Sequence, residues 1–272
     1  MFGSFKIGSI LGITIRVHVL LVVLLALFAF GGSRSTAEVI SLALLFPILL
    51  LHELGHCLVA RKFGLGVLDI TLWPLGGMAR MTNMPESGRV EGWVAVAGPA
   101  VNFVLAALII PVWMLALMMD ERSDLTSILW YALWINIVLG VFNLIPAFPT
   151  DGGRILRAIF SRSVDWERAT ERAVFVGRIF AVLIGVVGLA LGNWVAPLLA
   201  GWLWWMGALE LAQVRDRHRV REQEVPEPQA NAFSHAPFDG DFPLRAKRRF
   251  TDEDIERLER HRGRLRPFGD GP

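Results

Sequence analysis

The sequence predicts an all-α polytopic membrane protein with about six transmembrane helices and one membrane-associated β-hairpin. Of its 272 residues, 54% are hydrophobic and only 19% are charged, and the mean hydropathy of +0.49 lies well above that of water-soluble domains. Several apolar stretches approach the roughly 20 residues that a helix needs to cross a bilayer. The basic residues are also distributed unevenly along the chain. An ordinary soluble enzyme is therefore disfavoured.

Six apolar stretches are expected to be membrane spans once Gly, Ser and Thr are allowed inside them. They are Ile13–Phe30, Val39–Ala60, Trp93–Met118, Ile128–Ile145, Val174–Leu191 and Val195–Ala212. The first stretch has no convincing small-residue cleavage site, and residues 31–34 lead directly into the next apolar run. We therefore expect a retained anchor rather than a removable signal peptide.

The Lys and Arg residues predict the orientation of these spans, because cationic loops stay on the cytoplasmic side. With the N-terminus inside, 25 of the 27 Lys and Arg residues fall on the inner side, and only Arg34 and Arg122 fall in outer loops. This asymmetry predicts a multi-pass integral membrane protein with cytoplasmic N- and C-termini. We expect the membrane to be a bacterial inner (plasma) membrane.

Two parts of the chain are expected. Residues 1–212 would form the membrane core, and residues 213–272 would form a charged cytoplasmic tail that holds 13 Lys and Arg and 12 Asp and Glu residues. A Pro-containing stretch makes most of the tail unsuited to folding, whereas Thr251 and the acids after it predict a short C-terminal helix.

A hairpin is predicted between the second and third spans. Residues 65–84 place β-branched and apolar side chains on both sides of the pair Gly76 and Gly77. The segment is too apolar for a solvated turn, so we expect it to be associated with the membrane.

The segment His52-Glu53-Leu54-Gly55-His56 at the end of the second span carries the strongest chemical signal. Residues four apart share one face of a helix, so both imidazoles can bind one metal ion, with Glu53 placed to take a proton from a water molecule there. An accidental match on a core helix is the alternative, but an apolar span disfavours three ionisable residues without a function. Because Cys57 is the single cysteine, a metal would be held by His and carboxylate side chains.

Asp151 is a candidate for a third metal ligand. It lies in the segment from Phe142 to Arg154, where two prolines break the fourth span and two glycines follow the aspartate. The Asp151 carboxylate would lie on irregular backbone, which is tolerated at membrane depth only inside protein or beside water. The alternative is a Pro-Asp-Gly turn at the membrane surface. The segment alone supports both interpretations equally.

The core from about Gly8 to Ala212 resembles the site-2 protease family of intramembrane zinc metalloproteases. Four motifs carry the resemblance: His52–His56, Trp73–Gly77, Gly98–Asn102 and Asn143–Gly153. The connection Met119–Ser127 is too short for an inserted PDZ domain and the tail is too short for paired regulatory domains, so a short form is expected. Thr150 stands where the family more often has Leu, and little effect is expected.

The resemblance implies that His52, His56 and Asp151 are the ligands of Zn²⁺ and that Glu53 is the catalytic acid and base.

It further implies that Asn102 and Asn143 help to bind the substrate or the oxyanion. The Gly76–Gly77 hairpin would be a strand pair near the site, to whose edge an unwound substrate segment could pair.

The implied function is zinc-dependent hydrolysis of peptide bonds in or near the transmembrane segment of single-span membrane proteins, as in regulated intramembrane proteolysis. Its partners would be these substrates and the lipid bilayer; no nucleic acid is expected, and a homo-oligomer is left open.

One alternative is a catalytically silent protein that binds membrane clients, which would be expected to lose Glu53 or a ligand. Another is a metal-ion transporter, which would need several ionisable residues along a path.

Overall fold

The structure is a computed structural model that describes residues 3–30, 36–73, 76–82 and 84–224. Within these ranges the chain forms seven helices and four strands. In chain order they are β1 (Ser4–Ile10), β2 (Ile13–His18), α1 (Val19–Phe30), α2 (Thr36–Lys62), β3 (Gly66–Trp73), β4 (Gly76–Thr82), α3 (Gly88–Met119), α4 (Asp124–Asn143), α5 (Asp151–Phe160), α6 (Trp166–Ala190) and α7 (Val195–Glu224).

Among the described helices, five are long and apolar enough to cross a membrane, and they correspond to the last five predicted spans. They are Leu42–Lys62 within α2, Gly88–Met119, Asp124–Asn143, Trp166–Ala190 and Val195–Arg221 within α7. The prediction of a mainly helical, multi-pass membrane protein is confirmed.

The first predicted span is only partly helical. Ile13–His18 forms strand β2, and the 12 residues of α1 follow it. A helix of that length rises about 18 Å, less than the roughly 30 Å of a hydrocarbon core. The physical reason lies in the alternation of the strand, because Ile13, Ile15 and Val17 are buried while Thr14 and Arg16 between them are less so.

The predicted hairpin is confirmed as the antiparallel pair β3 and β4, in which Trp73 lies opposite Gly76. It belongs to a larger sheet than expected, of strand order β1-β2-β3-β4, in which β2 runs parallel to β3. Asp69 of β3 accepts a 2.6 Å hydrogen bond from Arg80 Nε of β4 and pairs with Arg16 Nε of β2 at 3.3 Å. The hydrogen bonds from Arg80 hold the pKa of the Asp69 carboxyl below its usual range.

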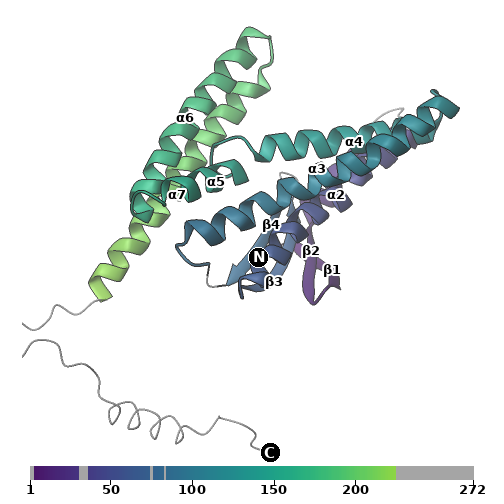
Figure 1. Ribbon diagram of the computed structural model, residues 1–272. Coiled ribbons are helices and arrows are strands. Elements are labelled where there is room, and N and C mark those ends of the chain that lie inside the picture. Colours follow the sequence, from purple (N-terminus) through teal and green to yellow (C-terminus); the bar gives the residue numbers. More distant parts are fainter. Residues whose placement is uncertain (1–2, 31–35, 74–75, 83, 225–272) are drawn as a thin grey trace, which may run out of the picture. The chain divides into compact units, whose positions relative to one another are not determined.

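Helix α2 joins the sheet to the helical layer. It packs against β3 and β4 on one side and against α3 and α4 on the other (Figure 1). A buried apolar cluster connects the sheet and the two helices α1 and α2: Ile13, Val17, Leu21, Leu49, Leu54, Cys57, Ile70 and Leu72.

One face of α3 is apolar and exposed. Val104, Leu108, Val112 and Leu115 follow helical spacing and are each more than half exposed. A stripe of this kind is unfavourable in water and suits contact with lipid, which agrees with a membrane-spanning helix.

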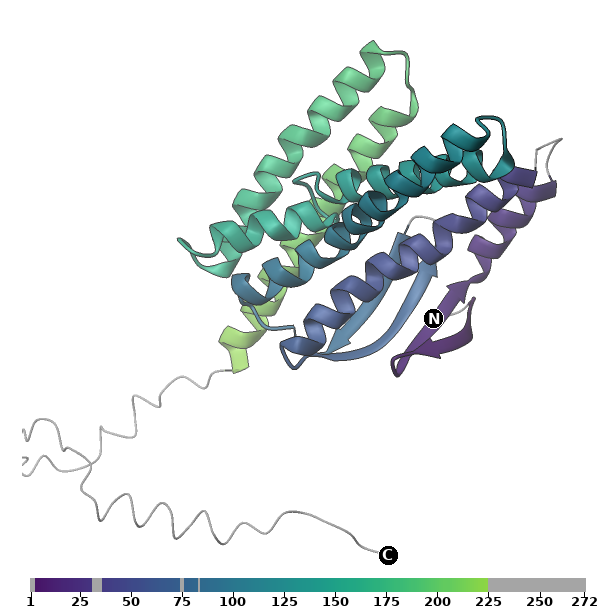
Figure 2. The same cartoon turned by 45° about the vertical axis from the view of Figure 1, so that its right-hand side comes forward.

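The C-terminal part of the described chain contains one helix that was not predicted and one that is longer than predicted. The short helix α5 follows the connection 144–150, and α6 and α7 then run antiparallel beside it (Figure 2). Ala147, Ala181 and Leu203 are buried together between these elements.

Helix α7 continues to Glu224, so the expected boundary between residues 212 and 213 falls inside a helix. The compact unit ends at Glu222. The rest of the predicted tail, with the helix expected after Thr251, lies outside the described residues.

Candidate active site

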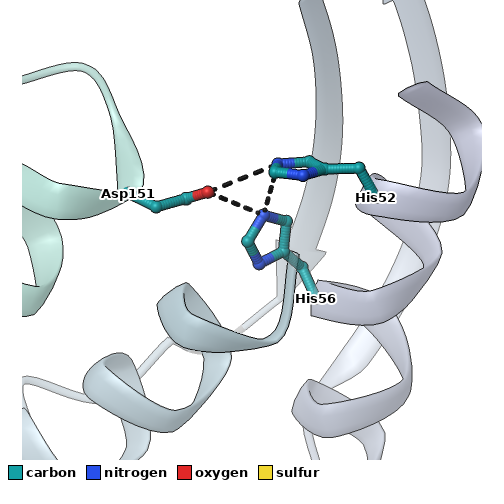
Figure 3. Close-up of side chains that lie close together, drawn as sticks. All are labelled: His52, His56 and Asp151. Carbon is teal, nitrogen blue, oxygen red and sulfur yellow. Dashed lines mark hydrogen bonds and ion pairs between the residues drawn. The ribbon is translucent and has the colours of Figure 1, made fainter. Parts of the chain in front are cut away.

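His52, His56 and Asp151 meet at one point, which two elements of the fold bring together. The histidines lie one turn apart near the end of α2, and Asp151 is the first residue of α5 (Figure 3). The His52 and His56 Nε2 atoms lie 3.2 Å apart, and Asp151 Oδ2 lies 3.3 Å and 3.1 Å from them. All three side chains are buried.

The Nδ1 atom of each imidazole, on the side away from Asp151, has a hydrogen-bond partner that fixes the orientation of the ring. His56 Nδ1 lies 2.7 Å from the backbone oxygen of Val94, and His52 Nδ1 lies 2.5 Å from Asn102 Oδ1. Because a carbonyl oxygen only accepts hydrogen bonds, both Nδ1 atoms carry the proton in this arrangement. Both Nε2 atoms then present lone pairs toward Asp151.

The donor set fits a small divalent cation. Two imidazole lone pairs and a carboxylate oxygen point at one another, and Asp151 Oδ2 is buried without a hydrogen-bond partner among the described residues. Three such acceptors repel one another unless a cation lies between them. A tetrahedral zinc site with bonds of about 2.0–2.1 Å has ligand-to-ligand edges of about 3.3–3.4 Å, close to the three distances observed.

Gly98 of α3 leaves the space that the two imidazole rings occupy. A Cβ atom at this position would come within 2.7 Å of His52 Nε2 and would also collide with the His56 ring. The glycine of the third motif therefore permits the close approach of α3 to the face of α2 that carries both histidines.

Asp151 lies at the start of a helix rather than on irregular backbone as predicted. Thr150 precedes α5, and its buried hydroxyl lies 2.5 Å and 2.7 Å from the backbone oxygens of Ile145 and Ala147. The single hydroxyl proton is shared between these two carbonyl groups of the broken segment, which gives this residue a structural role. A carboxylate in the first turn is also favoured by the helix dipole.

The cluster of His52, His56 and Asp151 borders a cavity of about 620 Å³. Glu53 and Asn143 also line it, together with charged residues of α5 and α7 that include Arg154 and Glu210. The cavity therefore brings a carboxylate and an amide beside three side chains that could hold a metal ion, which is an arrangement suited to hydrolysis.

Gly76 and Gly77 lie at the start of β4, and Gly77 lines the cavity. Gly76 has φ of +146°, a conformation that favours glycine. A Cβ atom at Gly77 would lie 2.5 Å from Glu53 Oε1, so the missing side chain allows Glu53 to lie against the strand.

The two asparagines occupy different places. Asn143 borders the cavity, and its Nδ2 donates a 2.9 Å hydrogen bond to the backbone oxygen of Leu139. Asn102 is fully buried behind His52, and its Nδ2 donates to Asn136 Oδ1 at 3.1 Å. Both ends of the Asn102 amide are engaged, so this geometry favours a role in positioning His52 over the predicted contact with substrate.

An ion-pair cluster beside the cavity was missed in the sequence, where Arg157 was counted only as an inner-loop charge. Arg157 of α5 donates to Glu91 of α3 through Nε at 3.0 Å and through Nη2, and to Glu210 of α7 through Nη1 at 2.7 Å. The cluster ties α3 and α7 to α5, the helix that carries Asp151. The signal in the sequence was Glu91, an acid just before the predicted span Trp93–Met118.

Comparison with known proteins gives consistent similarities. The sequence model of Peptidase family M50 matches residues 40–120 and 111–184. The zinc metalloprotease MJ0392 of Methanocaldococcus jannaschii is 35% identical over 201 residues, which cover 72% of this chain and 57% of that protein. Rip3 of Mycobacterium tuberculosis is 30% identical over 243 residues, which cover 83% of this chain and 61% of that protein. The chain thus spans about three fifths of the length of these relatives.

A solved structure is also similar. The site-2 protease from Methanocaldococcus jannaschii superimposes with a TM-score of 0.57 at 32% sequence identity, over 76% of this chain and 95% of that chain.

Proposed function

Because the chain belongs to peptidase family M50, the site-2 protease family, we propose that it is an intramembrane zinc-dependent endopeptidase. Its substrates would be single-span membrane proteins, cut in or near their transmembrane segment as in regulated intramembrane proteolysis. The observation that carries the proposal is the triangle of His52, His56 and Asp151, with Glu53 on the same cavity.

In the proposed reaction, Glu53 handles the proton. Zinc held by His52, His56 and Asp151 would lower the pKa of a water molecule to about 7 and polarise the scissile carbonyl group. Glu53 takes a proton from the attacking water and returns it to the leaving amine, so that a C–O bond forms as the C–N bond breaks.

Asn143 and strand β4 would hold the substrate. One N–H of the Asn143 side chain donates a hydrogen bond to the backbone oxygen of Leu139. The second N–H can donate to the carbonyl oxygen of the substrate as negative charge develops on it. Strand β4 is an edge of the sheet, and an unwound substrate segment would pair with it as a further strand. Substrate helices rich in weak helix formers would be preferred, because they unwind more readily.

We place the cavity on the cytoplasmic side of a bacterial inner membrane, with both termini in the cytoplasm. The cavity is lined by residues near the C-terminal parts of α2 and α7 and by Glu86, which precedes α3. Ten of the 14 Lys and Arg residues outside the tail fall in residues 61–89 and 154–178, around the two connections assigned to the inner side, as expected for cytoplasmic loops.

The test is a comparison of purified wild-type protein with Glu53→Gln on a panel of single-span peptides. We expect cleavage by the wild type and a loss of about 100- to 10,000-fold in the variant, while zinc remains near one ion per chain. Glu121→Gln, at an exposed position between α3 and α4 and away from the cavity, is the matched control and should cleave normally. Cleavage that survives Glu53→Gln would contradict the proposal.

A further inference from the structure

A chain of three buried amide and carbonyl groups runs from His52 across two helices. Asn102 of α3 accepts from His52 Nδ1 at 2.5 Å and donates to Asn136 Oδ1 of α4 at 3.1 Å. Asn136 Nδ2 donates in turn to the backbone oxygen of Ala132 at 2.8 Å. Both asparagines are fully buried, so water does not compete for these hydrogen bonds.

The last group determines the direction of the whole chain. A backbone carbonyl can only accept, so Asn136 must turn its NH₂ group toward Ala132 and its oxygen toward Asn102. Asn102 must then turn its NH₂ toward Asn136 and its oxygen toward His52. His52 Nδ1 must carry the proton, and Nε2 keeps the lone pair that faces His56 and Asp151.

We propose that Asn136 is a positioning residue for the metal site, acting through Asn102 to hold His52 in its metal-binding tautomer. An amide has a donor and an acceptor of nearly the same shape, so Asn102 alone could turn either way. A reversed amide would offer its NH₂ to His52 Nδ1 and would favour the tautomer with a proton on Nε2, and a protonated Nε2 has no lone pair for the metal ion that it faces. Asn136 favours one orientation of the Asn102 amide, because its own oxygen accepts a hydrogen bond from Asn102 Nδ2.

His56 needs no such partner, because its Nδ1 bonds directly to the backbone oxygen of Val94. The tautomers of the two histidines are therefore fixed differently. His56 bonds directly to a backbone carbonyl of α3, whereas His52 is linked through the side chains of Asn102 and Asn136 to a backbone carbonyl of α4.

The inference rests on the proposed metal site but not on peptidase activity, so the test measures the affinity for Zn²⁺ by competition with a chelator. Asn136→Leu should weaken Zn²⁺ binding about 10- to 100-fold, the usual effect of removing a partner of a metal-binding histidine. Leu133→Ala, a core truncation in the same helix, should lower the thermal midpoint while leaving the affinity within twofold of wild type.

A double variant separates positioning from folding. A carboxylate offers an acceptor whichever way it turns, so Asn102→Asp combined with Asn136→Leu should recover the affinity to within about threefold of wild type. A wild-type affinity in Asn136→Leu, an equal loss in Leu133→Ala, or no recovery in the double variant would each overturn the inference. A wild-type protein that binds no Zn²⁺ would instead contradict the proposed function.

Discussion

At the scale of single residues, the contact between Glu53 and Gly77 links the sheet to the chemistry. Glu53 lies on α2, one residue from His52, and Gly77 lies on the edge strand β4. An added Cβ at Gly77 would overlap the carboxyl end of Glu53. The glycine thus lets the proposed acid and base lie between the metal site and the strand expected to hold substrate.

Gly77→Ala should reduce peptide cleavage by at least tenfold while zinc stays near one ion per chain, because the new methyl group displaces Glu53 and leaves the three ligands in place. The measurement is the cleavage rate together with the metal content of the purified protein. Gly8→Ala is the matched control, since a Cβ there meets nothing within 4 Å in the same sheet. Equal rates for Gly77→Ala and wild type would refute the role of this contact.

His52, Glu53 and His56 could be predicted from the sequence because their spacing is local and its chemistry requires one helical face. The pattern of its own segment left Asp151 only a candidate, since its meeting with α2 depends on how distant segments pack, and the family resemblance was needed to predict it as a ligand. Asn136 was missed although a polar residue within an apolar span is itself a signal. Its role depends on a hydrogen bond to α3 that no spacing along one helix reveals.

At the scale of elements, α5 is held in place by the buried Arg157. Its guanidinium bonds to Glu91 through two nitrogens and lies 4.9 Å and 4.8 Å from the ring centroids of Phe148 and Trp166. The side chains of Arg157 and Glu91 are only 5% and 6% exposed, so water is a poor substitute partner for either charge. The position of Asp151, at the other end of α5, therefore depends on this cluster.

Arg157→Met should destabilise the protein by about 3–5 kcal/mol, because Glu91 is left as an unpaired buried charge. Combining it with Glu91→Leu should restore part of the loss, since both buried charges are then removed. Thermal unfolding in detergent, followed by tryptophan fluorescence, measures both effects. A double variant less stable than Arg157→Met would show that the pair is not the cause.

Two elements were not predicted from the sequence because each gives only a weak local signal. Ile13–His18 is apolar enough to be read as part of a span, and only its period of two distinguishes the strand. Helix α5 is short and amphipathic rather than apolar throughout, with two glycines in its first turn, so it was read as a loop. Its stability comes from packing and from Arg157 rather than from local propensity.

At the scale of the whole molecule, the charge asymmetry and the cavity both enter the proposed orientation. Charged residues of α5 and of the C-terminal half of α7 line the cavity, and in that orientation water would reach the site from the side on which the tail is expected. The long apolar helices could be predicted from composition alone, because lipid requires about 20 apolar residues wherever a helix crosses.

The orientation predicts opposite labelling of two single cysteines in a Cys57→Ala background. Arg122→Cys, between α3 and α4, should react with a membrane-impermeant maleimide in intact cells, whereas Ser163→Cys, between α5 and α6, should react only after the membrane is opened. The reverse pattern would contradict the proposed topology.

The most direct measurement of the central claim is a zinc titration of the chelator-treated protein with a cleavable single-span peptide. We expect no cleavage without metal and a linear rise in cleavage rate that saturates at one Zn²⁺ per chain, and we expect Asp151→Ala to remain inactive at the same Zn²⁺ concentrations. Cleavage by the metal-free protein, or full activity of Asp151→Ala, would contradict a zinc peptidase built on His52, His56 and Asp151.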